Sequence, residues 1–465
     1  MPLKHDLLPS LLKREKTTHC KVIATKRKKK STKQTHSTKS PRGNKNGTKT
    51  SNLNVTITPL DNISTAQSKR TTKSAPTGSK HNGAQPKNNQ SAINLPRVKQ
   101  RPATTAMFHP ETQSELKKKR SVSLLNSLKP ANLEIEKLRF LQSQNFEYEP
   151  QFVYRYPIRR SAKHKFSKAS DRFIFQAIHI LKHAIKIYGS YKAVEDYSGG
   201  RTLRKHEIYR AARQYIKDEN MENEIQVKLS EDLVARAMMV KVKGQGILNI
   251  RAHGVRDEWM SGLLKHEIGT HYLRSYNNLQ HPWRDWKRRK DLNMEPVNPT
   301  EEGLASLHSV LFRQHPVLWR AAILYYATYK AAKLSFSQLF KDLGKFMTDP
   351  LARWDYCLRV KRGITDTSIP GCFSKDQVYL EGALLILRDR EYINFHLLLQ
   401  LGKISYNDID NVKHLTELNN TRIPSFMKDL TLYRANLEHI LAGNGLTDDI
   451  LHMEHMDEEL TKKNP

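Results

Sequence analysis

The sequence predicts an α+β protein that is mostly α-helical, with a small β-sheet beside a helix that carries a metal-binding motif. Three observations support this fold class. The composition changes near residue 130, apolar residues recur at three- and four-residue spacing over most of the chain beyond that point, and short strand-like segments precede the stretch "KHEIGTH". We therefore expect a disordered basic N-terminal region over residues 1–130 and one folded domain over residues 131–465.

The N-terminal region is strongly basic and almost free of large apolar side chains. The chain has 465 residues and a formal charge of +33, and residues 1–130 hold 28 Lys and Arg against 5 Asp and Glu, a net charge of +23. Phe108 is the single aromatic residue among them. Such a segment cannot bury enough apolar surface to offset its chain entropy, so we expect it to be disordered.

Two basic runs, at residues 26–30 ("KRKKK") and 117–120, suggest a role for this region. They fit a solvated linker or electrostatic attachment to a polyanion, either a microtubule, a nucleic acid or an anionic lipid. The first run also suits nuclear import. Nucleic acid would bind such a charge only nonspecifically, so charge alone does not select the partner.

The cysteine count and the hydropathy indicate an intracellular protein. Three cysteines do not make a disulfide framework. No apolar run approaches 18 residues, and the first residues lack the apolar core of a signal peptide. We therefore expect a reducing compartment and no membrane partner.

The predicted elements occur in order along the folded domain. Residues 172–197 have helical periodicity, and a turn at Gly199–Gly200 leads into another helix. Residues 224–252 indicate a strand, a helix or turn, and a strand pair broken by Gly244 and Gly246. The chain after "NPTEEG" is nearly all helical in pattern.

The stretch "KHEIGTH" resembles a zinc motif with one extra residue. His266 and His271 are five positions apart, which places them about 140° apart on a regular α-helix, too far to share a metal. A π-bulge near residues 268–270 would absorb the extra residue. Gly269 lowers the steric obstacle to that distortion, because it lacks a Cβ. The alternative is a chance pairing on an ordinary helix.

A third ligand is expected in "NPTEEGLASLHS". Thr300 fits the N-cap of a helix, so Glu301 and Glu302 fall in its first turn. Carboxylates are also common there without a metal, because they face the positive helix end. Either glutamate could complete a His-His-Glu site, and His308 is a weaker alternative.

The stretches "LLKHEIGTHYLRSYNN", "NPTEEGLASLHSVLF" and "TDTSIPGCFSKDQVYLEG" closely resemble the microtubule-associated tyrosine carboxypeptidase family, over about residues 140–440. The chain looks more like the second vertebrate paralogue than the founding enzyme. The resemblance implies a zincin-like domain over residues 131–465 that removes the C-terminal tyrosine of α-tubulin. It implies one Zn²⁺ on His266, His271 and Glu302, with Glu267 as the general base.

The remaining site residues are less specific. Tyr379 could supply a second donor to the oxyanion, whereas Cys372 and Ser374 have no evident base. The clamp for the substrate carboxylate needs Arg or Lys. The candidates are Arg251, Arg274, Lys375 and Arg362. The strand "GILNIRA" could also pair with the substrate backbone.

Three functions remain open from the sequence. The first is a tubulin tyrosine carboxypeptidase that acts on the α-tubulin tail and the microtubule lattice, in the cytoplasm and on the cytoskeleton. The second is a metallopeptidase with a different protein C-terminus as substrate. The third is a non-catalytic basic protein that binds microtubules or nucleic acid, and the intact Glu267 argues against it.

Overall fold

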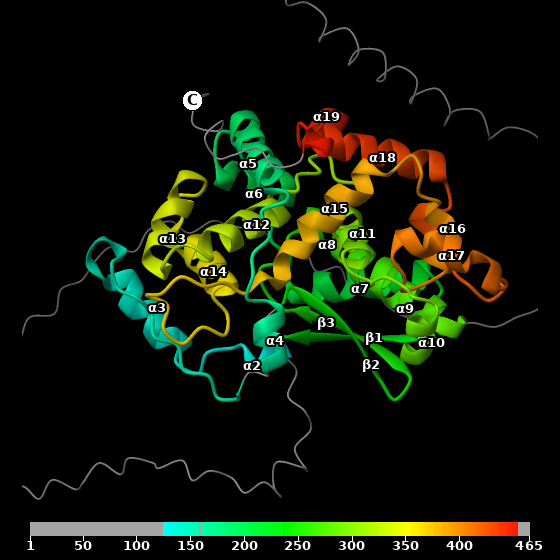
Figure 1. The fold of residues 1–465 in the computed structure, drawn as a ribbon, viewed down its shortest axis with the longest axis horizontal. Helices are drawn as coiled ribbons and strands as arrows, with labels where there is room; N and C mark the ends of the chain where they lie inside the picture. Colours follow the sequence, from blue (N-terminus) through cyan, green and yellow to red (C-terminus); the bar gives the residue numbers. More distant parts are fainter. Residues whose placement is uncertain (1–123, 158–159, 234, 454–465) are drawn as a thin grey trace, which may run out of the picture. The chain divides into compact units, whose positions relative to one another are not determined.

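The computed structural model describes residues 124–157, 160–233 and 235–453, and most of them are helical (Figure 1). One small sheet accompanies the helices, so the predicted fold class is confirmed. Helix α2 (Leu124–Ser127) and the buried Leu128 fall within the range that the sequence assigns to the tail. Residues 1–123, which hold both basic runs and most of the range predicted to be disordered, lie outside the described residues. None of the helices in these ranges combines the length and the apolar content needed to cross a membrane.

Helices precede the sheet. They are α3 (Leu133–Gln142), α4 (Arg160–Lys165), α5 (Ile174–Tyr188), α6 (Tyr191–Gly199) and α7 (Lys205–Asp218). The single helix predicted over residues 172–197 is in fact two. Gly189 ends α5 with φ of 83°, a conformation that favours glycine. Ser190 then caps α6 by accepting a 3.2 Å hydrogen bond from the amide of Ala193.

Three strands form the sheet in the order β1–β3–β2. They are β1 (Ile225–Ser230), β2 (Ala237–Val242) and β3 (Gln245–Arg251). Strand β3 pairs with β1 in parallel and with β2 antiparallel, so it is the central strand. The prediction that "GILNIRA" accepts an added strand is therefore wrong, because both of its edges are occupied. Strand β2 is an edge strand instead.

Helices also come after the sheet. They are α8 (Asp257–Leu264), the π-helical segment (Lys265–Tyr272), α9 (Leu273–Asn278), α10 (Trp286–Asp291), α11 (Thr300–His308), α12 (Trp319–Ala331), α13 (Phe336–Asp342), α14 (Pro350–Val360), α15 (Val378–Arg388), α16 (Phe395–Gln400), α17 (Ile409–Val412), α18 (Leu430–Gly443) and α19 (Asp448–His452). Short 3₁₀ turns connect them, among them Pro282–Arg284 and Ser374–Gln377.

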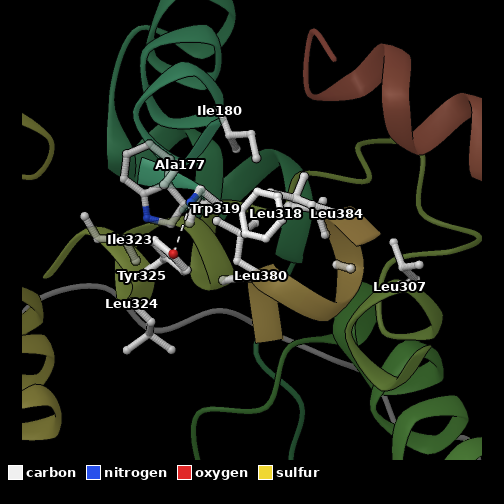
Figure 2. Close-up of a cluster of buried hydrophobic side chains, with 14 of the residues drawn as sticks. Ala177, Ile180, Leu307, Leu318, Trp319, Ile323, Leu324, Tyr325, Leu380 and Leu384 are labelled. Atoms are coloured by element: carbon white, nitrogen blue, oxygen red, sulfur yellow. Dashed lines mark hydrogen bonds between the residues drawn. The ribbon is translucent and has the colours of Figure 1, made fainter. Parts of the chain in front are cut away.

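Two hydrophobic cores meet at the motif. The larger core surrounds α12, where Trp319, Ile323 and Tyr325 pack against α5 and α15 (Figure 2). The smaller core joins α7, the sheet and the π-helical segment, which contributes Ile268. Helix α11 belongs to the larger core through Leu304. Because α11 also packs against the π-helical segment, the motif lies at the seam between the two cores.

Helix α11 is fixed by a backbone-to-backbone crossing with α15. A Cβ added to Gly303 would lie 2.3 Å from the carbonyl carbon of Gly382, so neither position tolerates a side chain. Thr300 was predicted to cap α11, but the structure places Pro299 at the N-cap. The buried Thr300 hydroxyl instead accepts a 3.2 Å hydrogen bond from the amide of Tyr406.

Candidate functional site

A π-helical segment carries the motif, as the five-residue spacing predicts. The Thr270 hydroxyl donates a 2.9 Å hydrogen bond to the carbonyl of Lys265, five residues earlier. The structure explains the need for a glycine at position 269 differently from the sequence. A Cβ there would lie 2.5 Å from the ring of Phe426, so the glycine makes room for a packed side chain.

His266, His271 and Glu302 form a group with metal-binding geometry. One ligand atom from each lies within 4.8 Å of the others. Nε2 of His271 lies 3.7 Å from Oε2 of Glu302, and the two imidazole rings are 4.9 Å apart. The widened helix therefore brings together two histidines that a regular α-helix would separate.

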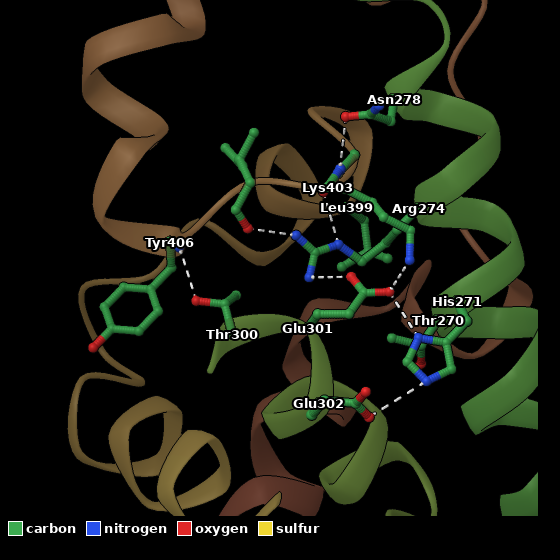
Figure 3. Close-up of polar contacts among 12 residues, drawn as sticks. Thr270, His271, Arg274, Asn278, Thr300, Glu301, Glu302, Leu399, Lys403 and Tyr406 are labelled. Carbon is green, nitrogen blue, oxygen red and sulfur yellow. Dashed lines mark hydrogen bonds and ion pairs between the residues drawn. The ribbon is translucent and has the colours of Figure 1, made fainter. Parts of the chain in front are cut away.

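Hydrogen bonds leave the same nitrogen free on both histidines. Nδ1 of His266 lies 2.9 Å from the carbonyl of Ala305. Nδ1 of His271 lies 2.7 Å from Oε1 of Glu301 (Figure 3). Both oxygens are acceptors, so both Nδ1 atoms donate and both Nε2 atoms carry a lone pair. Burial and the nearby His271 lower the pKa of His266 to about 4, which keeps it neutral. The donor set therefore fits a divalent metal.

Glu301 supports the site from behind and is itself held by two cations. Nη1 of Arg274 lies 3.2 Å from its Oε2, and the Lys403 ammonium contacts its Oε1 (Figure 3). Burial alone would raise the pKa of Glu301, but Arg274 and Lys403 hold it far below the usual range. Burial lowers the pKa of His271, but the hydrogen bond to Glu301 and the negative charges of Glu301, Glu302 and Glu267 together outweigh it, so the net shift is upward.

Two predicted roles are wrong. Arg274 is fully buried, and its guanidinium donates to the carbonyls of Gly402 and Ile404 at 2.8 and 2.7 Å. It therefore cannot clamp a substrate carboxylate. His308 is not a ligand, because its Nδ1 lies 2.7 Å from the Thr270 hydroxyl and its Nε2 lies 2.9 Å from the Tyr433 hydroxyl.

Glu267 lies beside the three candidate ligands and is anchored by the edge strand. Its Oε2 accepts a 2.9 Å hydrogen bond from the amide of Met239 on β2. Among the described residues, its Oε1 has no hydrogen-bond partner. Burial raises the pKa of this carboxyl, and His271 offsets part of the rise. The carboxylate is thus oriented by one oxygen and available through the other.

A cavity of about 250 Å³ opens at His266 and Glu267 and is lined by four arginines. They are Arg236, Arg313, Arg320 and Arg359. Arg359 is paired with Asp376 at 2.5 Å, but no described residue hydrogen-bonds or ion-pairs with the guanidinium of Arg320. Arg236 stacks on Trp259 at 4.1 Å and has no hydrogen bond from its side chain within the described ranges.

Crowded positive charge and burial act together in this cavity. Burial, with the nearby charge of Arg320, lowers the pKa of Arg236 to about 9. Burial, with the nearby charge of Arg359, also lowers the pKa of Arg320. Both groups remain cationic at neutral pH, so the cavity holds partly buried positive charge that favours an anionic occupant.

Of the other predicted site residues, one lines the cavity and three do not. Tyr379 lines the cavity, and burial and then Glu302 raise its pKa. Arg251, Lys375 and Arg362 do not line it. The Arg251 side chain bonds the carbonyl of His253 at 3.2 Å, near the end of β3.

Sequence reasoning missed the cavity arginines. The signal for Arg320 was present, because this residue stands alone in the apolar stretch "VLWRAAILYYA". A lone charge within an apolar helix is buried and needs a partner. Arg236 has no such signal, since it lies between a turn and a strand.

Comparisons with known proteins agree with the resemblance. A sequence model of the microtubule-associated tyrosine carboxypeptidase family matches residues 158–444, which include all the candidate ligands and the whole cavity. The mouse protein named "Putative tyrosine carboxypeptidase MATCAP2" is 51% identical over 354 residues, which cover 76% of this chain and 67% of that protein. The human "Microtubule-associated tyrosine carboxypeptidase 1" is 48% identical over 329 residues, which cover 71% of this chain and 70% of that protein. The chain belongs to the microtubule-associated tyrosine carboxypeptidase family.

Proposed function

We propose that this chain is a zinc-dependent carboxypeptidase that removes the C-terminal tyrosine of α-tubulin on cytoplasmic microtubules. One observation carries the proposal. The guanidinium groups of Arg320 and Arg236 line the same cavity as Glu267 and the metal-ligand candidate His266, and within the described ranges neither makes a hydrogen bond or an ion pair. An endopeptidase needs no such cations in its cleft, whereas a carboxypeptidase must bind a free carboxylate beside the scissile bond.

Glu267 is assigned the proton transfers. Zinc held by His266, His271 and Glu302 would acidify a bound water and polarise the scissile carbonyl. Oε1 of Glu267 accepts the proton of the attacking water and passes it to the leaving amine. The bond from Met239 to Oε2 keeps the carboxylate facing the cavity throughout.

Arg320 is assigned the terminal carboxylate, with Arg236 beside it. The planar guanidinium of Arg320 can bind both carboxylate oxygens at once, which fixes the position of the terminal residue. Tyr379 lines the same cavity, and the charge of Glu302 contributes to its raised pKa. Its hydroxyl is assigned to the oxyanion that forms at the scissile carbonyl.

The direction of β2 fits a substrate that ends in this cavity. The amide of Arg251 bonds the carbonyl of Arg236, so alternation directs the N–H and C=O groups of Ala237, Met239 and Lys241 away from β3. Ala237 lines the cavity and Lys241 lies at the exposed end of the strand. An extended peptide added antiparallel to β2 would therefore place its C-terminus in the cavity and its upstream residues beside Lys241.

Turnover of tyrosinated microtubules tests the proposal. The wild-type protein should release tyrosine from the polymer and from a short tail peptide, and Glu267→Gln should release none while retaining its metal. A tail peptide with an amidated C-terminus should not be cleaved. Cleavage of other C-termini but not of tubulin would favour a metallopeptidase with a different substrate. Microtubule binding by metal-loaded protein without any turnover would favour a non-catalytic function.

A further inference from the structure

A surface on α10 is the strongest feature that the proposed activity does not use. All five tryptophans of the chain lie within the described residues, and four of them are buried. Trp286 is the exception, with 70% of its surface exposed. It is the first residue of α10, which Figure 1 shows at the periphery of the fold next to α9. Tryptophan is enriched among the residues that contribute most to binding at protein interfaces.

Positive charge surrounds this tryptophan. The stretch "RDWKRRKD" (residues 284–291) holds five cations and two acids. Arg284, Lys287, Arg288 and Lys290 are exposed, and no residue of the described ranges lies within ion-pair distance of them. Nζ of Lys290 lies 5.9 Å from the centre of the Trp286 ring. The surface is therefore an aromatic centre with a basic rim.

The helix that presents these side chains is rigidly held. The fully buried Trp283 donates a 3.0 Å hydrogen bond to the carbonyl of Leu401, and Asp285 caps α10 through the amide of Lys287 at 2.7 Å. Nη1 of Arg289 donates to the carbonyl of Lys403 at 2.8 Å. Trp286 is therefore exposed on a helix that is held in place by hydrogen bonds.

The contacts that hold α10 also extend to the candidate metal site. Lys403 receives the bond from Arg289 through its carbonyl, and its ammonium contacts Glu301, which bonds His271. A partner seated on α10 would thus be held at a fixed position relative to the cleft. That arrangement suits a substrate whose scissile end is tethered to a large surface.

We propose that Trp286 and the exposed cations of α10 form a docking surface for the acidic folded face of the microtubule lattice. This inference rests on the proposed function for the identity of the partner. A rigid aromatic anchor needs an ordered surface with a matching recess, whereas a flexible acidic tail offers charge alone. A membrane is disfavoured, because the six-residue α10 has no continuous apolar face.

Helix α7 offers a matched control. Tyr209 is 47% exposed there, and the exposed cations Arg210, Arg213 and Lys217 accompany it. The test pair is Trp286→Ala and the triple change Lys287→Glu, Arg288→Glu, Lys290→Glu. The control pair is Tyr209→Ala and the triple change Arg210→Glu, Arg213→Glu, Lys217→Glu. Each triple changes the charge by the same amount.

Co-sedimentation of the full chain with intact and tail-trimmed microtubules tests the inference. Trp286→Ala should weaken binding to both lattices by about thirtyfold, and the α10 triple change should weaken it at least as much. The α7 variants should bind like the wild type. Turnover of a short tail peptide should stay unchanged in all four, because none of these side chains lines the cavity.

Several outcomes would overturn the inference. They are unchanged binding by the α10 variants, an equal loss in the α7 variants, a loss confined to untrimmed lattices, or a parallel loss of peptide turnover. Loss of binding to phosphatidylserine vesicles with lattice binding intact would point to a membrane instead. A wild-type protein that binds the lattice through α10 but cleaves no peptide would refute the proposed activity alone.

Discussion

Glu301 and His271 are joined by a 2.7 Å hydrogen bond from Nδ1 to Oε1, while the neighbouring Glu302 faces Nε2 of the same ring at 3.7 Å. Two adjacent glutamates thus approach opposite sides of one imidazole. This arrangement divides their roles, because Glu301 fixes the tautomer and Glu302 completes the ligand group.

Exchanging each glutamate for glutamine separates these roles. Glu302→Gln should lose most of the bound metal, because a charged ligand is removed. Glu301→Gln should bind one metal per chain with affinity about 10- to 100-fold lower, as for other residues that orient a ligand. Metal analysis and competition with a chelator would measure both. A greater loss of metal in Glu301→Gln than in Glu302→Gln would make Glu301 the ligand and Glu302 the residue that orients His271.

Arg274 should matter for stability more than for substrate binding. Arg274→Met would leave the buried Glu301 with one fewer neighbouring cation. It would also remove the hydrogen bonds to the carbonyls of Gly402 and Ile404. Removing one partner of a buried ion pair costs about 3–5 kcal/mol in free energy of unfolding. Urea unfolding of the metal-free protein would measure the loss.

Arg251→Met provides the comparison for Arg274. Its side chain makes one bond, near the end of β3, and does not line the cavity. It should change the free energy of unfolding by about 0.5 kcal/mol or less. Equal losses in the two variants would show that the network behind Glu301 contributes little.

Arg320 should determine the preference for a free carboxylate. Arg320→Gln removes a partly buried cation that has no hydrogen bond or ion pair among the described residues, so the free energy of unfolding should not fall. Losing a buried charged pair with the substrate costs about 2–5 kcal/mol, which lowers kcat/KM for an acid-ended peptide by about 30- to 4,000-fold. The wild type should distinguish a peptide acid from its amide by a similar factor. An unchanged ratio in Arg320→Gln would assign the carboxylate to another residue.

The sequence predicts the helical class, the three strands and the π-helical segment, because each depends on local periodicity or spacing. It could not separate Glu301 from Glu302 without the family resemblance. Both lie in the first turn of α11 and both approach His271, so their roles depend on how α11 is placed, and its crossing with α15 at Gly303 and Gly382 is part of that placement. That crossing joins residues that are far apart in the chain.

The sequence could not identify the cavity arginines for the same reason. Arg274 and Arg251 lie close in sequence to the metal motif, but neither lines the cavity. Of the arginines that do line it, Arg236 precedes β2, Arg320 lies on α12 and Arg359 lies on α14, and only tertiary packing brings them together. Strand order is also non-local, so the sequence could not show that β3 is central and β2 is the edge.

The open edge of β2 leads to the last prediction. The Lys241 N–H points away from β3, so Lys241→Pro removes an outward donor and leaves the ladder to β3 intact. Lys241 lies four positions after Ala237 along the strand, a span of about 13 Å. A long acidic peptide would reach this donor, whereas a two-residue substrate would not.

Measurements of kcat/KM on long and short peptides test this pairing. Lys241→Pro should lower the value for the long peptide by about three- to tenfold relative to Lys241→Ala, which corresponds to one lost hydrogen bond. The value for the two-residue substrate should not change. Comparison of Lys241→Ala with the wild type measures the effect of the lysine charge alone. Val240→Pro should instead destabilise the sheet, because the Val240 N–H donates a hydrogen bond to β3. If Lys241→Pro and Lys241→Ala cleave the long peptide equally well, the substrate backbone does not pair with β2 at this position.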